Sequence, residues 1–172
     1  MPTIYFEEEQ RFTQGWIFLL LIVPVTVIVW GVIQQVIMGI QFGNNPAPDW
    51  VLILILAFMM LLAAFPFILK LKTLINKEGI SYRFFPFHRS FKTITWDMVD
   101  KVYVRKYSPI GEFGGWGFRY GKNGKALNTS GNKGLQIEFR NGTKLLIGTQ
   151  RPDELQKTLY QLGVSSISGF SG

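Results

Sequence analysis

Residues 16–40, WIFLLLIVPVTVIVWGVIQQVIMGI, contain no charged side chain, and neither do residues 50–69, WVLILILAFMMLLAAFPFIL. A helix needs about 20 mainly apolar residues to cross the hydrocarbon core of a bilayer. A helix at the surface of a soluble domain keeps a polar stripe at helical spacing, whereas residues 19–25 and 51–64 are apolar all round. The sequence therefore predicts two transmembrane helices, at 16–40 and 50–69. Two buried core helices are the alternative.

The segment between these stretches, residues 41–49 (QFGNNPAPD), is short and rich in Asn, Gly and Pro. Such a composition is typical of a turn, so we expect an antiparallel helical hairpin with a short external loop. A cleaved signal peptide is the competing interpretation of the first stretch. It is disfavoured because residues 5–10 are acidic rather than basic and no small-residue cleavage site follows.

The distribution of lysine predicts the orientation. The loop 41–49 has no Lys or Arg, whereas Lys70, Lys72 and Lys77 follow the second stretch closely. Basic residues near span ends favour the cytoplasmic side. We therefore expect a multi-pass protein of the plasma (inner) membrane with both termini cytoplasmic, residues 1–15 forming an N-terminal tail. The same three lysines could also contact an anionic leaflet.

The charge of the chain is uneven. Residues 1–69 contain one basic and four acidic residues, whereas residues 70–172 contain 17 basic and 7 acidic residues. A strongly basic half suggests an anionic surface as partner, either a membrane or a nucleic acid. Tethering to a membrane disfavours nucleic acid.

Cysteine is absent, which excludes disulfides, thiolate catalysis and Cys-ligated metal sites. The only histidine is His88, so His-rich metal sites are excluded too. We expect His88 to be an exposed turn residue. No cofactor or metal is predicted.

Beyond residue 71 the periodicity changes to two, which predicts short strands. Asn141-Gly142 predicts a type I′ hairpin turn, and Asn123-Gly124 is a second candidate. The expected strands are residues 80–85, 91–96, 101–105, 116–121, 125–129, 135–140 and 143–147.

One helix is expected to close the domain. Pro152 suits its first position, Leu155, Leu159 and Leu162 share one face, and Gly163 ends it. The sequence thus predicts an α+β chain, with a domain at residues 70–163 and a flexible tail at 164–172.

Four segments of this domain carry a resemblance to a known family: Glu78-Gly79-Ile80 with Pro86-Phe87, residues 94–99, residues 114–119 and residues 147–155. Together they resemble bacterial pleckstrin-homology-like (PH-like) domains carried by small membrane proteins. The resemblance covers about residues 71–163. It implies an antiparallel β-barrel capped by a C-terminal helix, behind a helical hairpin, and it implies no reaction.

Two groups of residues stand out in the domain. The first is a basic set that could form one patch for anionic lipid headgroups, although a solvated face is the alternative: Arg105, Lys106, Arg119, Lys122, Lys125 and Lys133. The second is structural, with glycines that bend a strand at a barrel corner around a buried tryptophan, and with turn and cap residues: Gly115, Trp116, Gly117, Asn141, Gly142, Gly148 and Pro152.

No phosphate-binding loop, nucleophile elbow or zinc-protease motif is present. An enzyme would need a compact cluster of titratable groups that the sequence does not display. We therefore expect a non-enzymatic, membrane-anchored interaction or scaffold module that binds a protein partner or copies of itself. A sensor of anionic lipid is the alternative.

Overall fold

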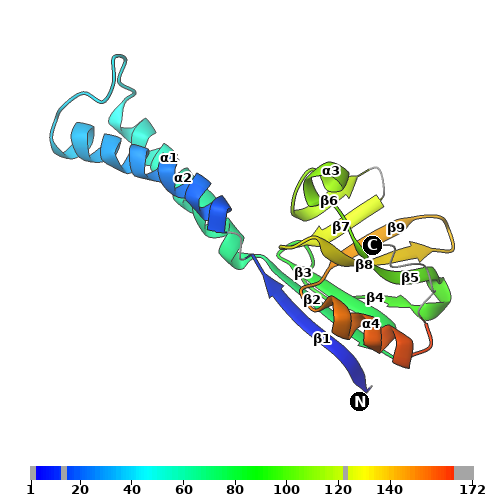
Figure 1. The fold of residues 1–172 in the computed structure, drawn as a ribbon. Coiled ribbons are helices and arrows are strands. Elements are labelled where there is room, and N and C mark those ends of the chain that lie inside the picture. Colours follow the sequence, from blue (N-terminus) through cyan, green and yellow to red (C-terminus); the bar gives the residue numbers. More distant parts are fainter. Residues whose placement is uncertain (1–2, 13–14, 122–123, 165–172) are drawn as a thin grey trace. The chain divides into compact units, whose positions relative to one another are not determined.

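A computed structural model describes residues 3–12, 15–121 and 124–164. It separates into two compact units, a helical unit at Gln14–Ile68 and a mixed unit made from the chain on both sides of it (Figure 1). The α+β class expected from the sequence is confirmed. We call the second unit the domain.

The helical unit contains α1 (Gly15–Val32), which continues into a π-helical segment (Ile33–Ile37), and α2 (Asp49–Ile68). Both are long and apolar enough to cross a membrane. The rings of Phe18 and Phe67 lie 4.8 Å apart, so the start of α1 packs against the end of α2. At the loop, the Gln35 side chain donates 2.7 Å hydrogen bonds to the Ala47 carbonyl and the Asp49 carboxylate.

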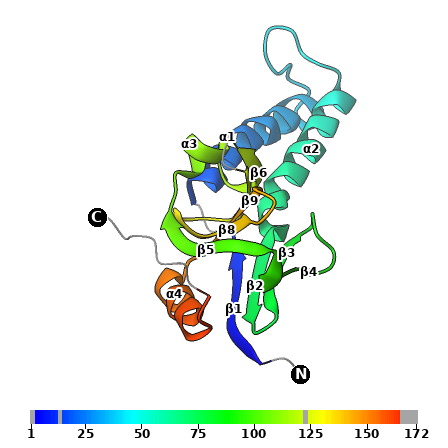
Figure 2. The ribbon, with the colours of Figure 1, turned by 90° about the vertical axis from the view of Figure 1, so that its right-hand side faces the viewer.

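The domain contains two sheets (Figures 1 and 2). The first has the order β1 (Ile4–Arg11), β2 (Lys70–Asn76), β3 (Gly79–Phe85) and β4 (Lys92–Thr95), with every neighbour antiparallel. The second has the order β5 (Val99–Lys106), β8 (Lys133–Phe139), β9 (Lys144–Gly148), β7 (Gly124–Asn128) and β6 (Gly117–Gly121).

Two features of the predicted antiparallel barrel are wrong. Within the described ranges, the two sheets do not close into one barrel. The pair β7–β9 is also parallel, with Lys125 opposite Leu145 and Leu127 opposite Ile147. The parallel pair arises because β8 and β9 form a hairpin whose second strand inserts beside β7.

Strand β1 lies where we expected a tail at residues 1–15, and this expectation was wrong. β1 pairs with β2 along its length, from Ile4 opposite Asn76 to Arg11 opposite Lys70. Its inward residues are Phe6, Glu8 and Gln10, all buried. Because two of these three inward residues are polar, the alternation of buried and exposed residues along β1 cannot be recognised from hydrophobicity. The helical unit is thus inserted between two paired strands.

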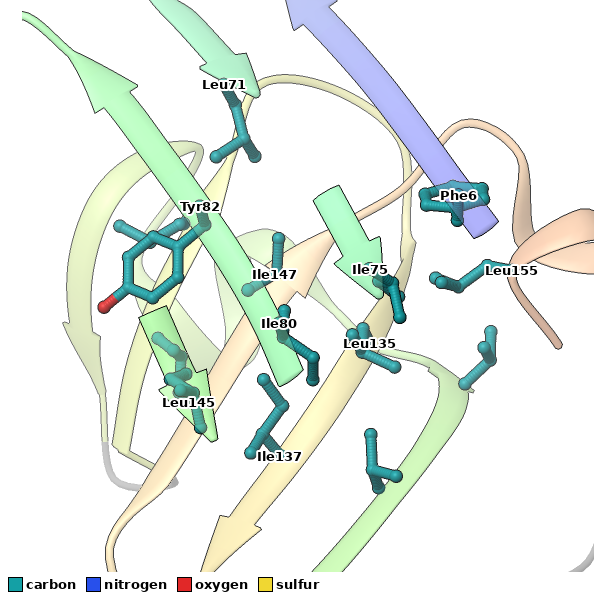
Figure 3. Packing of buried hydrophobic residues seen from close by; sticks show 14 of the residues in the cluster. Phe6, Leu71, Ile75, Ile80, Tyr82, Leu135, Ile137, Leu145, Ile147 and Leu155 are labelled. Atoms are coloured by element: carbon teal, nitrogen blue, oxygen red, sulfur yellow. The ribbon is translucent and has the colours of Figure 1, made fainter. Parts of the chain in front are cut away.

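The main core fills the space between the sheets (Figure 3). Alternate residues of β2 and β3, such as Leu71, Ile75 and Ile80, face Leu135 and Ile147 of the second sheet. All five are at most 1 % exposed. The alternation that predicted the strand at residues 80–85 is therefore the alternation of core and solvent faces in β3, whereas β2 was not among the predicted strands.

Helix α4 (Pro152–Gln161) confirms the predicted closing helix, with Pro152 at its start. Leu155 and Leu159 are fully buried in the main core, and α4 contacts β5 and β1. Val164, predicted to begin a tail, packs partly buried against this core, whereas residues 165–172 lie outside the described residues.

A short helix that the sequence did not reveal, α3 (Pro109–Phe113), lies before β6. Ser108 caps it by accepting a hydrogen bond from the Gly111 N–H (3.1 Å). Phe113 forms a second, smaller core with Tyr107, Ala126 and Leu146. This core lies on the face of the second sheet opposite to the main core, since Leu146 alternates with Leu145 and Ile147.

The turn at Asn141-Gly142 is a hairpin turn but not the predicted type I′. Type I′ needs positive φ at both residues, and among the described residues only glycines have positive φ, Gly142 at 81°. The Gly142 N–H donates to the Phe139 carbonyl (2.9 Å) and the Phe139 N–H to the Thr143 carbonyl (2.9 Å). This pattern is a three-residue loop with one left-handed glycine. Residue 123 of the second predicted turn is not described.

Candidate functional site

A cavity of about 400 Å³ opens at one side of the domain, between β3 and the strands of the second sheet. Tyr82 comes from β3, Tyr120 from β6, Lys125 from β7 and Lys144 from β9. The wall is therefore assembled from strands of both sheets. Its remaining lining residues are Gly121, Gly124, Phe139, Thr143 and Leu145.

His88 lies in an aromatic cluster beside this cavity. Its ring makes edge contacts with Tyr82 and Phe118, each at 5.7 Å between centroids. The residue is only 8 % exposed, so the prediction of an exposed turn histidine was wrong. The structure buries it because the turn after β3 folds back: the His88 N–H donates to the Phe84 carbonyl (2.7 Å).

The surroundings of the His88 imidazole favour its neutral form. Burial lowers its pKa below 6.5, and the charges of Lys92 and Lys125 lower it further. Its Nδ1 atom is buried and has no hydrogen-bond partner among the described residues. A general base would need a nucleophile or an orienting carboxylate in contact with this ring, and the described contacts are aromatic.

Of the two lysines that line the cavity, only one is in an ion pair within the described chain. Lys144 Nζ lies 3.0 Å from Glu138 Oε1, and this hydrogen bond lowers the pKa of Glu138. Lys125 Nζ instead lies 5.2 Å from the ring centroids of both Phe118 and Tyr120. Lys125, one of the predicted binding residues, is thus a cation placed over aromatic faces at the rim.

Arg105 is engaged within the fold. Its guanidinium forms a two-pronged pair with Glu112, at 2.7 and 3.1 Å, and Nε donates to Gln136 Oε1 (2.9 Å). The Arg105 and Glu112 side chains are each 23 % exposed. Arg105 therefore anchors α3 to the second sheet, and its donors are directed at protein rather than at solvent.

The other predicted binding residues do not gather around Arg105. Lys106 lies directly opposite Lys133 at one end of the β5–β8 ladder, and both are exposed. Arg119 lies on the same sheet face as Ala126, whereas Lys125 shares the other face with Leu127. Lys122 is not described. The predicted single patch is therefore distributed over both faces of the second sheet.

The lysines predicted to lie near the membrane also separate. Lys70 is opposite Arg11 at the end of the sheet from which both connections to the helical unit leave. Lys72 pairs with Glu7 at 2.6 Å. Lys77 follows β2 at its far end, roughly 20 Å from Lys70 at about 3.3 Å per strand residue. Only Lys70 and Lys72 lie near the connections.

The predicted barrel corner is a bent segment with a half-buried tryptophan. Gly115 and Gly117 have φ of 128° and 113°, which a residue with a Cβ rarely adopts, so they allow the chain to bend into β6. Trp116 does not fill the interior. Its indole N–H donates to the Gly131 carbonyl (3.0 Å) and the residue is half-buried.

A polar network that sequence reasoning missed fixes β1 to the second sheet. The buried Glu8 carboxylate accepts from the Thr149 hydroxyl and from the Gln150 N–H, both at 2.7 Å. Gln10 Nε2 donates to the carbonyl of Gly148 (2.7 Å), and Gln10 Oε1 accepts from the Thr129 hydroxyl (3.2 Å). The carbonyl of Gly148, a predicted structural glycine, is thus a partner of β1.

A second open cavity, of about 510 Å³, lies between Val104 of β5 and the outer side of α4, at Asp153, Lys157 and Tyr160. Across the described ranges, no group of three His, Asp or Glu side chains could hold a metal ion.

The comparison with family models matches residues 2–167. The chain belongs to DUF6141, a family of unknown function. The match includes β1, both long helices and the whole domain. The family model therefore covers both paired strands, β1 and β2, and the helical unit inserted between them. A search of curated proteins finds no match.

Proposed function

We propose that this DUF6141 chain is a membrane-anchored, non-enzymatic interaction module. In this proposal α1 and α2 cross the plasma membrane as a hairpin, and the domain stays at the cytoplasmic face, where it binds a protein partner or another copy of itself. The observation that carries it is the pairing of β1 with β2 on either side of the helical unit.

Strand pairing restricts the topology. β1 and β2 can form a ladder only if both lie in the same compartment, and each is joined directly to one of the two helices. Two crossings return the chain to its starting side, whereas one crossing would separate the strands. Paired strands therefore favour either two crossings or none.

The surface of the helices supports two crossings. Many large apolar side chains of both helices are exposed, and in water they would form an apolar patch far larger than a soluble monomer tolerates. They include Leu19, Leu20, Ile22, Val23, Val27, Leu54, Phe58, Met60, Leu61 and Phe67, each more than half exposed. A bilayer would cover them.

A PH-like origin of the domain is part of the proposal. Two packed sheets followed by a C-terminal helix that buries Leu155 and Leu159 in their common core support this assignment. The extra strand β1 and the parallel β7–β9 pair depart from a simple antiparallel barrel. Folds of this kind host many unrelated tasks, so the assignment supports no particular ligand.

The alternative, a lipid sensor built from the Arg105–Lys133 set, has less support. Arg105 is bound to Glu112, and Lys125 lies on the opposite sheet face from Arg119. A lipid-binding site on this domain would therefore have to use a different set of cations.

Single cysteines test the topology, because the chain has none of its own. Asn44→Cys places a thiol in the loop between the helices, and Lys157→Cys places one on the exposed side of α4. In intact cells a membrane-impermeant maleimide should label Asn44→Cys alone, and Lys157→Cys should be labelled only after permeabilisation. Equal labelling of both, or recovery of the chain from the soluble fraction, would overturn the proposal.

The interaction role needs its own measurement. A photo-crosslinking residue at Tyr160 or Tyr120, the exposed tyrosines of the two cavities, should yield a discrete adduct with a partner or a second copy in cells. The exposed turn residue Lys77 is the matched control. Equal, unspecific adducts from all three positions, or none, would contradict a binding role.

A further inference from the structure

The turn after β3 presents three phenylalanines to solvent. Phe85 is 40 % exposed, Phe87 51 % and Phe91 38 %. We call residues 85–92 the aromatic turn. Three large apolar side chains are thus exposed within seven positions, and exposed apolar side chains that gather in one region commonly mark a contact with a partner or a membrane.

The aromatic turn is held in shape by its own domain. The Phe87 ring stacks on Phe84 at 5.5 Å and on Phe118 at 5.4 Å between centroids. The Arg83 guanidinium lies 4.9 Å from the centre of the Phe91 ring. The Phe87 and Phe91 rings are therefore held in place by the buried Phe84 and by the half-buried Phe118 and Arg83.

The register places this turn at one end of the first sheet. Phe85 lies directly opposite Lys70, and Lys70 lies directly opposite Arg11. Lys70 follows the last residue of α2, Ile68, by two positions. The aromatic turn is thus at the same sheet end as both covalent connections to the apolar helices.

The charged residues of β3, the aromatic turn and β4 are all basic. Residues 79–96 contain Arg83, Arg89 and Lys92 and no acidic residue. Arg89 and Lys92 are exposed. Lys92 and Lys125 both act electrostatically on His88, so Lys125 contributes to the same positive region.

We propose that the aromatic turn is a second membrane contact of this chain, in which Phe85, Phe87 and Phe91 enter the headgroup region and the neighbouring cations bind anionic lipid phosphates. The inference rests on the proposed membrane anchoring. Phenylalanine is among the side chains that interfacial segments bury at the boundary between headgroups and acyl chains, and juxtamembrane cations are attracted to the anionic cytoplasmic leaflet. A protein partner is less well matched, because the rings and cations lie beside the connections to the membrane helices.

This contact shares Lys125 with the lipid-sensing hypothesis but differs from it in its other residues and in its role. Arg105, Lys106 and Lys133 take no part in it. The two connections and the aromatic turn would together hold the first sheet at several points, so the domain would keep a defined orientation against the leaflet.

A lipid-depth measurement on the full chain tests the contact. Ser90→Cys, an exposed position inside the turn that leaves every phenylalanine in place, carries an environment-sensitive fluorophore. Lys157→Cys on α4 is the solvent control, and Leu20→Cys in α1 is the anchoring control. Each is reconstituted into phosphatidylcholine vesicles with or without phosphatidylglycerol, and quenching by nitroxide-labelled lipid is measured at low and high salt.

With phosphatidylglycerol present, we expect severalfold more quenching at position 90 than at position 157, reduced at high salt. The double variant Arg89→Gln/Lys92→Gln should lose most of this excess, whereas Lys101→Gln/Lys157→Gln, which removes the same charge elsewhere, should keep it.

The outcomes separate the two proposals. Quenching at position 20 but only control-level quenching at position 90 would overturn the membrane contact and leave the anchoring intact. A blue shift at position 90 without lipid quenching would indicate a protein contact instead and would also overturn it. Absence of quenching at position 20 would refute the anchoring, and the contact with it.

Discussion

Arg11 and Lys70 lie directly opposite each other in the β1–β2 ladder, although all of α1, the loop and α2 separate them in the sequence. The helical unit is therefore an insertion in the domain rather than a segment in front of it. Because β1 is covalently continuous with the first helix, anything that detaches β1 from the sheet would leave the domain joined to the helices through β2 alone.

We expect Glu8→Ala to weaken this attachment. The substitution removes a buried carboxylate that accepts two 2.7 Å hydrogen bonds, from Thr149 and from the Gln150 N–H. Leaving these donors unsatisfied should lower the free energy of unfolding by about 1–3 kcal/mol. Denaturant titration of the purified chain in detergent, followed by tryptophan fluorescence, measures it.

Glu9→Ala is the matched control, since Glu9 is the next residue on β1 and forms an exposed pair with Arg11. Exposed pairs contribute little, so its effect should stay within about 0.5 kcal/mol. Equal losses for the two variants would show that the buried network does not hold β1.

The parts of the fold predicted from the sequence are those in which one physical signal dominates. Two charge-free runs predicted α2, and α1 together with its π-helical continuation, to within a few residues, and alternation predicted strands such as β3 and β8. β1 was missed because its inward positions include Glu8 and Gln10, whose burial depends on partners more than 100 residues away. No local pattern reports such partners.

Arg105→Ala should lower stability rather than membrane binding. The change removes a two-pronged pair with Glu112 and a hydrogen bond to Gln136, all partly buried. Hydrogen bonds to charged groups contribute about 1.5–3 kcal/mol, and we expect a loss of that order in the free energy of unfolding. Thermal or denaturant unfolding, together with vesicle binding, distinguishes the two roles.

Lys106→Ala, an exposed change at the next position, should alter stability by less than about 0.5 kcal/mol. A greater loss of stability for Lys106→Ala than for Arg105→Ala would contradict the structural role of Arg105. A loss of vesicle binding specific to Arg105→Ala would show that Arg105 is a binding residue.

The candidate site was harder to predict than the fold. The sequence grouped cations by closeness in the chain, but in a sheet neighbouring residues point to opposite faces, so Arg119 and Lys125 separate. The cavity instead brings together Tyr82 and Tyr120 from different sheets. The only feature of the local sequence that pointed to this cavity was the cluster of aromatic residues around His88. We had interpreted that segment as an exposed turn.

Gly142→Val should destabilise the β8–β9 hairpin. Gly142 has a φ of 81°, and the left-handed conformation costs residues with a Cβ about 1–2 kcal/mol. We expect at least that loss in the free energy of unfolding, because a β-branched side chain is still less compatible with positive φ. Gly142→Asn is the control, since asparagine adopts this conformation more readily, and its loss should be clearly smaller. Equal stability of both variants and the parent chain would contradict the assigned turn.

The domain should lose stability when His88 becomes protonated. Burial and the nearby Lys92 and Lys125 lower the pKa of His88 below 6.5, whereas in the unfolded chain it returns to about 6.5. Between these two values the unfolded state binds more protons than the folded state. The stabilising effect of the neutral ring is therefore complete above about pH 6.5 and decreases as the pH falls towards the folded-state pKa.

Because His88 is the only histidine in the chain, its imidazole resonance reports the pKa without ambiguity. An NMR titration should give a midpoint below 6.5, and Lys92→Gln should move it upward by removing one of the two repelling charges. His88→Phe preserves ring contacts with Tyr82 and Phe118 but cannot bind a proton. Its free energy of unfolding should therefore fall less than that of the parent chain between about pH 7 and pH 5.5. A midpoint at or above 6.5, together with parallel pH profiles for the two proteins, would mean that the ring is solvated in the folded chain and that the aromatic cluster around it is open.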